Sequence, residues 1–242
     1  MILRLGGGDL NALFGIAGFA GGIGFGTIFL KKGYSLQRTY ALSKLESAMM
    51  PAIQVGLLVL VVTAPAFIFF SQKGPGAMHA PWLISLAAGL VVGGLSQVSR
   101  LCTVGGFRDL FLFKKSILIF GYLAVLIGVF VVNISFGNFH LGFENQPIAH
   151  TDGLWNFLGM ALAGFCSVLL GGCPLRQLIM TGEGNSDSAV TVLGLAAGAA
   201  FAHNFGLAAT GAGPTLNGEI AVGVGFVVAL IIAILNTKRV NA

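Results

Sequence analysis

Long apolar runs alternate with short polar loops along most of the chain. A helix needs about 20 mostly apolar residues to cross a bilayer, so each run predicts one membrane-spanning helix. Aromatic residues near run ends, such as Trp82 and Trp155, are typical of membrane interfaces. The predicted spans are 13–30, 48–70, 82–98, 116–134, 154–170, 189–208 and 220–235. The pattern predicts an all-α polytopic membrane protein with about seven transmembrane helices.

The charges of the loops predict the orientation of these spans. Lys and Arg are concentrated in 31–47, after the third and fifth spans, and after the last span. The intervening loops contain only Lys73 or no basic residue at all. Because basic short loops remain in the cytoplasm, we expect the N-terminus outside and the C-terminus in the cytoplasm.

The composition supports the membrane assignment and excludes several classes of site. Of the 242 residues, 56% are hydrophobic and only 9% are charged, whereas soluble domains carry about 25% charged residues. The net charge of +5 comes from the short loops, so it does not indicate nucleic-acid binding. Three cysteines without a C-x-x-C pair argue against a disulfide framework and a structural zinc site. We expect neither a metal ion nor a cofactor.

The third and fifth predicted spans end in the same unusual way. The first reads "GLVVGGLSQVSRLCTVGGFRDLFLFKK" and the second "LAGFCSVLLGGCPLRQLIMTGEGN". Each has a cysteine beside a glycine pair, and then an apolar stretch of about ten residues that is too short to cross. Such stretches predict two re-entrant half-helices, which at membrane depth must line protein or a water-filled path. Discontinuous helices of this kind form the binding sites of many secondary transporters.

The residues around these breaks are candidates for a solute path. Pro174 suits the first turn of a helix, so Cys173 would lie where free N–H groups favour an anion or a thiolate. We interpret Cys166, within an apolar span, as a packing residue. The candidate path residues are Cys102, Cys173, Arg176, Arg108, Gly105, Gly106, Gly172, Pro174, Glu183, Asn185 and His203.

Several candidates have an ordinary structural alternative. Arg108 and Arg176 could attract anions or simply anchor cytoplasmic loops. Glu183 and Asn185 could contact substrate, or they could cap the sixth span, since Asn favours N-caps. His203 is an intramembrane polar residue and therefore a functional candidate, but a hydrogen bond between helices explains it equally well.

The two ends of the chain suggest internal symmetry. With Met1 matched to Gln177, four glycines in or before the first span (Gly6, Gly8, Gly18 and Gly22) fall on glycines in or before the sixth. The loop charges give these two spans opposite directions. Two similar segments that cross the membrane in opposite directions are typical of inverted-repeat transporters. We expect 1–70 to hold the last two spans of an incomplete N-terminal half, and 71–242 a complete five-span half carrying both cysteine segments. The missing spans would precede Met1 or come from a partner chain.

These motifs also resemble a known family. "SRLCTVGGFRD" and "LGGCPLRQLIMTGEGN" resemble the YeeE/YedE family of bacterial membrane proteins, and "GEGNSDSAVTVLG" and "AHNFGL" are similar to its YedE-related selenium-metabolism branch. Cys102 matches the family's C-F-R-D-like motif and Cys173 its Gly-Cys motif, while the cysteines of the family's N-terminal half have no counterpart here.

The resemblance implies a permease in a bacterial or archaeal plasma (inner) membrane. It would move a thiosulfate-like sulfur or selenium anion into the cytoplasm along a cysteine-lined path, without an enzymatic step. A small soluble sulfur-carrier protein on the cytoplasmic side is the implied partner, alongside membrane lipid. The alternatives are a channel-like pore for another solute, a membrane thiol–disulfide oxidoreductase using Cys102 and Cys173, and a structural subunit of a larger transporter.

Overall fold

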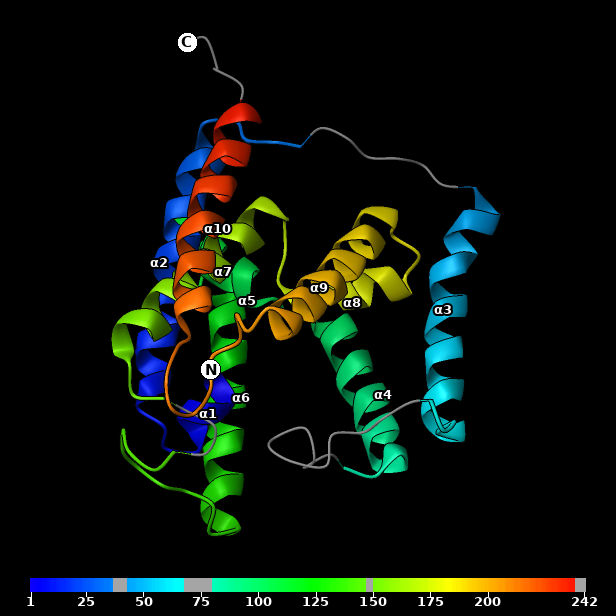
Figure 1. Cartoon of the computed structure of the whole chain (residues 1–242), viewed down its shortest axis with the longest axis horizontal. Helices are drawn as coiled ribbons and strands as arrows, with labels where there is room; N and C mark the ends of the chain where they lie inside the picture. Colours follow the sequence, from blue (N-terminus) through cyan, green and yellow to red (C-terminus); the bar gives the residue numbers. More distant parts are fainter. Residues whose placement is uncertain (37–42, 68–79, 147–149, 238–242) are drawn as a thin grey trace. The chain divides into compact units, whose positions relative to one another are not determined.

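The computed structural model describes residues 1–36, 43–67, 80–146 and 150–237 (Figure 1). Every regular element in those residues is a helix, which confirms the all-α prediction. The helices are α1 (Ile2–Gly6), α2 (Asn11–Lys31), α3 (Lys44–Thr63), α4 (Trp82–Ser99), α5 (Thr103–Phe113), α6 (Ile117–Ser135), α7 (Gly153–Leu169), α8 (Pro174–Gly182), α9 (Ser186–Asn204) and α10 (Leu216–Leu235).

The helices establish a polytopic membrane protein. Five helical stretches of the described residues are long and apolar enough to cross a membrane: α2, α4 with α5, α6, α7 with α8, and α10. Helix α3 adds a shorter apolar stretch, Pro51–Thr63. Helix α9 forms where the sixth span is predicted, but it is not among the five, and polar residues such as Asp187, His203 and Asn204 stand near its ends. The count of seven spans stays a prediction.

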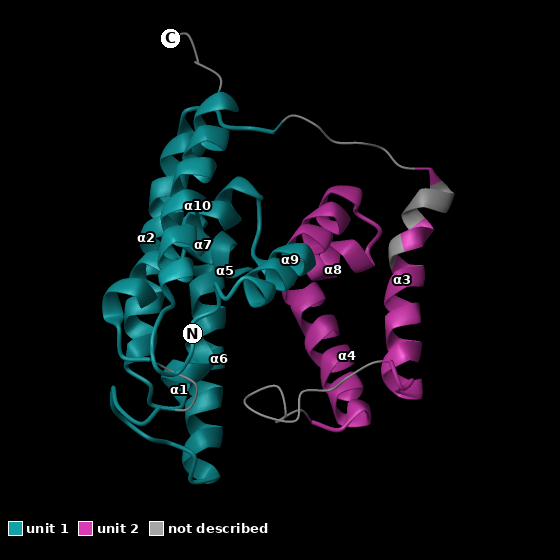
Figure 2. Ribbon diagram, viewed as in Figure 1, with its two compact units in different colours: residues 1–38, 102–174, 195–242 teal, residues 39–101, 175–194 magenta. Residues whose placement is uncertain are grey.

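The chain divides into two compact units, coloured separately in Figure 2. Unit 1 comprises residues 1–38, 102–174 and 195–242, and unit 2 comprises 39–101 and 175–194. The boundary between them falls beside each of the two cysteines, Cys102 and Cys173. The division into repeat halves at 1–70 and 71–242 concerns internal symmetry, and it also stays a prediction.

Close packing of α2 against α7 forms the centre of unit 1. A Cβ atom on Gly18 would overlap the carbonyl oxygen of Phe157, and one on Gly22 would overlap that of Ala161. From the other side, a Cβ atom on Gly164 would overlap the carbonyl of Phe19. Such contacts between backbones need glycine, and they supply the van der Waals packing that holds membrane helices together.

A small apolar core closes one end of unit 1. Its buried members are Tyr34, Phe165, Leu169, Ala229 and Ala233, which come from α7, α10 and the turn after α2. Cys166 packs against this cluster, which agrees with its interpretation as a packing residue.

The hydrogen bonds at this end fix the direction of three helices. The Tyr34 hydroxyl donates to the carbonyl of Leu169 at 3.3 Å, just past α2 and at the end of α7. The Ser35 N–H donates to the carbonyl of Asn236, at the end of α10, at 3.1 Å. Helices α2, α7 and α10 therefore finish at the same end of unit 1, as Figure 1 shows.

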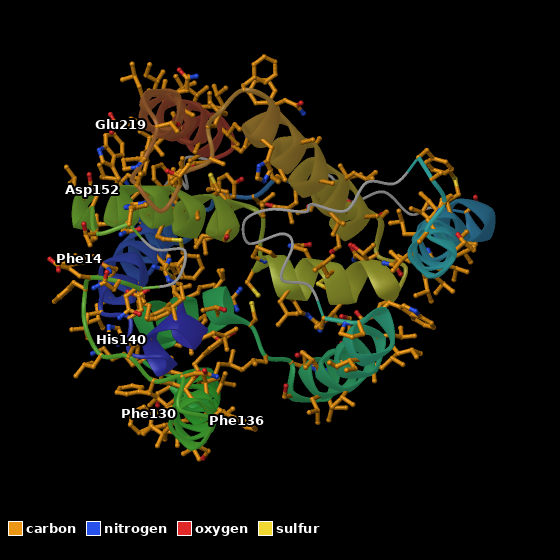
Figure 3. The ribbon with its side chains drawn as sticks, turned by 60° about the horizontal axis from the view of Figure 1, so that its bottom comes forward. Phe14, Phe130, Phe136, His140, Asp152 and Glu219 are labelled. Atoms are coloured by element: carbon orange, nitrogen blue, oxygen red, sulfur yellow. The ribbon has the colours of Figure 1, made fainter. Side chains whose placement is uncertain are left out.

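The opposite end of unit 1 holds the start of α2 and the loop after α6. The Leu10 N–H donates to the Gly142 carbonyl at 3.0 Å, so α6 runs against α2. Figure 3 brings this end forward and labels Phe14, His140 and Asp152 there, together with Glu219 at the start of α10. The relative directions of α2, α6, α7 and α10 are those that the loop charges predict.

A buried ion pair fixes the start of α2. The carboxylate of Asp9, only 3% exposed, accepts hydrogen bonds from the Arg4 guanidinium at 2.6 Å and from the Asn11 N–H at 2.9 Å. The Asn11 side chain in turn donates to the Phe143 carbonyl at 2.6 Å. Because a buried carboxylate is costly unless it is paired, this network ties the N-terminal segment to the loop after α6.

Candidate functional site

The helix is interrupted after α4, where the first half-helix is predicted to begin. Arg100 adopts a left-handed conformation with φ of 50°, and the Leu101 N–H donates back to the Ser96 carbonyl at 3.3 Å. Cys102 is then extended and caps α5, because its sulfur accepts a hydrogen bond from the Gly105 N–H at 3.3 Å. A cap of this kind satisfies one of the free N–H groups at a helix start.

The second break follows α7. Gly171 has a φ of +83°, and the Gly172 N–H donates to the Ser167 carbonyl at 3.1 Å. This Schellman arrangement ends a helix and favours glycine at the left-handed position. Cys173 follows at once, and Pro174 is the first residue of α8, as predicted. Both short helices form, although their depth in a bilayer stays a prediction.

The two breaks bring their cysteines together within unit 1. The side chains of Cys102 and Cys173 form a hydrogen bond, and the Cys173 N–H also faces the Cys102 sulfur. Cys173 is only 3% exposed, while Cys102 is partly exposed. Residues far apart in the sequence thus form a close thiol pair.

Two hydroxyl groups complete this cluster, and sequence reasoning missed both. Thr103 is the first residue of α5, and its Oγ1 lies 2.6 Å from the hydroxyl oxygen of Tyr122 on α6. The Tyr122 hydroxyl is also close enough to interact electrostatically with Cys102 and Cys173. A signal was present, since Tyr122 is a polar group within an apolar span and such residues are functional candidates. We call Cys102, Thr103, Tyr122 and Cys173 the thiol–hydroxyl cluster.

The three glycines named as candidate path residues have different roles around this cluster. A Cβ atom on Gly105 would lie 3.3 Å from both the Cys102 Cβ and a Leu118 methyl group. One on Gly106 would lie 3.4 Å from the Leu118 Cβ. These two glycines let the start of α5 approach α6, and buried Gly172 belongs to the turn before Cys173.

A second polar cluster lies within unit 2. Arg176 on α8 donates to the Gln97 side-chain oxygen on α4 at 2.9 Å, and its guanidinium lies 3.9 Å from the Glu183 carboxylate. The Gln97 amide also donates to Glu183. Arg176 therefore has protein partners, and the Gln97–Arg176–Glu183 cluster joins α8 to α4. Whether Arg176 also attracts an anion stays a prediction.

Two of the remaining candidates, Arg108 and Asn185, bond to near neighbours in the sequence. Arg108 forms an ion pair with the adjacent Asp109 at 2.9 Å. The Asn185 side chain accepts from the Ser188 N–H at 2.9 Å and so caps α9, the structural role considered for it. His203 lies exposed in the last turn of α9. Within the described residues no group of three His, Cys, Asp or Glu side chains is placed to hold a metal ion.

Comparison with known protein families identifies a family to which the chain is similar. The profile of a protein family described as "Sulphur transport" matches residues 98–238, a region that contains both helix breaks and the whole thiol–hydroxyl cluster. Neither the comparison with curated proteins nor the comparison with solved structures found a match.

Proposed function

Because the chain belongs to the sulphur-transport (YeeE/YedE) family, we propose that it moves a small sulfur-containing anion such as thiosulfate into the cytoplasm. The path passes the thiols of Cys102 and Cys173. The membrane is the bacterial or archaeal plasma membrane, and the basic loops and the C-terminus face the cytoplasm, following the distribution of Lys and Arg.

The observation that carries this proposal is the hydrogen bond between the two thiols. An anion must lose water to enter the membrane, and an unpaired charge there is very costly. Thiols are weak hydrogen-bond donors, so they can contact the sulfur atom of thiosulfate without holding it tightly. A transport path needs binding that is strong enough for entry and weak enough for release.

The polar groups outside the thiol–hydroxyl cluster have secondary roles in this proposal. The Gln97–Arg176–Glu183 cluster joins α8 to α4 within unit 2. A selenium analogue of the anion is an alternative cargo, since selenium resembles sulfur in size and softness. A small soluble sulfur-carrier protein receives the cargo on the cytoplasmic side.

The test is uptake of ³⁵S-thiosulfate into proteoliposomes. Cys173→Ala and Cys102→Ala should each slow uptake at least about fivefold, since a hydrogen bond contributes about 1 kcal/mol net and 1.4 kcal/mol is tenfold. Cys166→Ala is the matched control, because Cys166 packs against the apolar core, and it should transport like the wild type. Wild-type protein that takes up no thiosulfate, or a Cys173→Ala variant with full uptake, would refute the proposal.

A second function is favoured by the same hydrogen bond. Two thiols this close could form a disulfide, losing two electrons and two protons to a membrane quinone as the acceptor. Thiol trapping during turnover separates the two functions. A Cys102–Cys173 disulfide that forms and is reduced in step with substrate indicates the oxidoreductase, whereas thiols that stay reduced during uptake indicate the permease.

A further inference from the structure

The Thr103–Tyr122 pair offers a kind of hydrogen-bond donor that the thiols lack. A hydroxyl is a strong donor to oxygen, whereas a thiol is a weak donor suited to a soft sulfur atom. In the described residues each of the two hydroxyls has the other as its hydrogen-bond partner, across 2.6 Å. Only one hydroxyl hydrogen is used in that bond, so the other remains available to a ligand.

The position of this pair relates it to the thiols. Thr103 directly follows Cys102, which caps the helix that Thr103 begins, and the Tyr122 hydroxyl lies near both cysteines. The cluster therefore presents weak sulfur donors and a strong oxygen donor from one place. The four side chains carry no formal charge as thiols and hydroxyls, so a bound anion meets neutral donors that release it easily.

We propose that Thr103 and Tyr122 determine substrate class by binding the oxygen end of the anion, while Cys102 and Cys173 face its sulfur end. This inference rests on the proposed function and deepens it. Thiosulfate has one terminal sulfur and three oxygens, and so it uses both kinds of donor. Sulfate has no soft terminal sulfur for the thiols, and thiocyanate has no oxygen for the hydroxyls. The site therefore prefers an anion that has a terminal sulfur at one end and oxygen atoms at the other.

The experiment compares KM and maximal rate for thiosulfate uptake in four variants. Tyr122→Phe and Thr103→Val each remove a hydroxyl but keep the shape, and each should raise KM about fivefold, equivalent to about 1 kcal/mol at 1.4 kcal/mol per tenfold. The maximal rate per folded protein should change by less than about twofold, since a binding contact is lost and not the fold. Thr103→Ser keeps the hydroxyl and should retain the wild-type KM.

Tyr34→Phe is the matched control for loss of a tyrosine hydroxyl in unit 1. The Tyr34 hydroxyl donates to the Leu169 carbonyl at the far end of the α2–α7 pair from the loop after α6, and its loss should leave KM unchanged. This inference alone would be overturned if Tyr122→Phe and Thr103→Val kept the wild-type KM. The condition is that the wild type takes up thiosulfate normally and that Cys173→Ala takes it up slowly. A Thr103→Ser variant as impaired as Thr103→Val would also overturn it, by showing a packing role. Wild-type protein without uptake would instead remove the proposed function.

Discussion

Adding one methyl group at Gly22 measures how closely α2 and α7 must pack. A Cβ atom there would overlap the Ala161 carbonyl oxygen and lie 2.9 Å from the Phe165 backbone nitrogen. Both atoms belong to the α7 backbone, which cannot move aside as a flexible side chain can. The Gly22→Ala variant must therefore push the two helices apart.

The neighbouring Gly21 provides the matched control. A Cβ atom at Gly21 would meet only the Phe157 ring, at an ordinary distance of 3.8 Å. Alanine in place of a helical glycine is favourable by up to about 1 kcal/mol, and this gain applies to both variants. Overpacking at Gly22 costs about 1–3 kcal/mol, so the two variants should differ by that amount.

This difference in stability is measured by thermal unfolding of detergent-purified protein, with size-exclusion chromatography used to quantify the folded fraction after heating. For a chain of this size each kcal/mol shifts Tm by about 2–4 °C, so Gly22→Ala should unfold about 2–12 °C below Gly21→Ala. Both variants are heated at one scan rate, because membrane-protein unfolding is often irreversible. A Gly22→Ala variant that unfolds at or above the temperature of Gly21→Ala would refute the close packing of these helices.

Three further substitutions test the polar contacts by the same thermal assay. Asp9→Asn should be the most damaging, by about 2 kcal/mol, because it removes the charge that pairs with the partly exposed Arg4 guanidinium. A smaller loss than for either of the two substitutions below would contradict this. Asn185→Ala removes the α9 cap and should cost about 1 kcal/mol, whereas Asn185→Asp should be neutral. Gln97→Ala removes two hydrogen bonds in an exposed cluster and should cost about 1 kcal/mol or less; a larger loss would mean that the cluster is less accessible to water.

The helices could be predicted because their signals are local. An apolar run of about 20 residues identifies a span wherever it occurs, and α2, α4, α6, α7 and α10 begin and end within a few residues of the predictions. The half-helices were equally visible, since the glycine pair and Pro174 signal the break before α8. Helix α9 is the exception in composition, because polar residues near both of its ends make it a weaker span signal.

The partners of individual polar residues could not be predicted, because those contacts join distant segments. Nothing near Tyr122 in the sequence indicates that its hydroxyl meets Thr103. The sequence predicted that Arg176 could attract an anion. It could not show the contacts of Arg176 with Gln97 and Glu183, because these form only when α4 and α8 pack. The matching motifs made Cys102 and Cys173 candidates for one solute path, but they did not predict the hydrogen bond between the two side chains.

Whether substrate reaches the thiol pair can be measured by protection of single cysteines. Variants that keep only Cys102, only Cys173 or only Cys166 are treated with a maleimide in proteoliposomes, with thiosulfate or with sulfate at equal ionic strength. We predict that thiosulfate, but not sulfate, slows the labelling of Cys102 and Cys173 and leaves that of Cys166 unchanged. Labelling of Cys102 and Cys173 at the same rate with and without thiosulfate would contradict it.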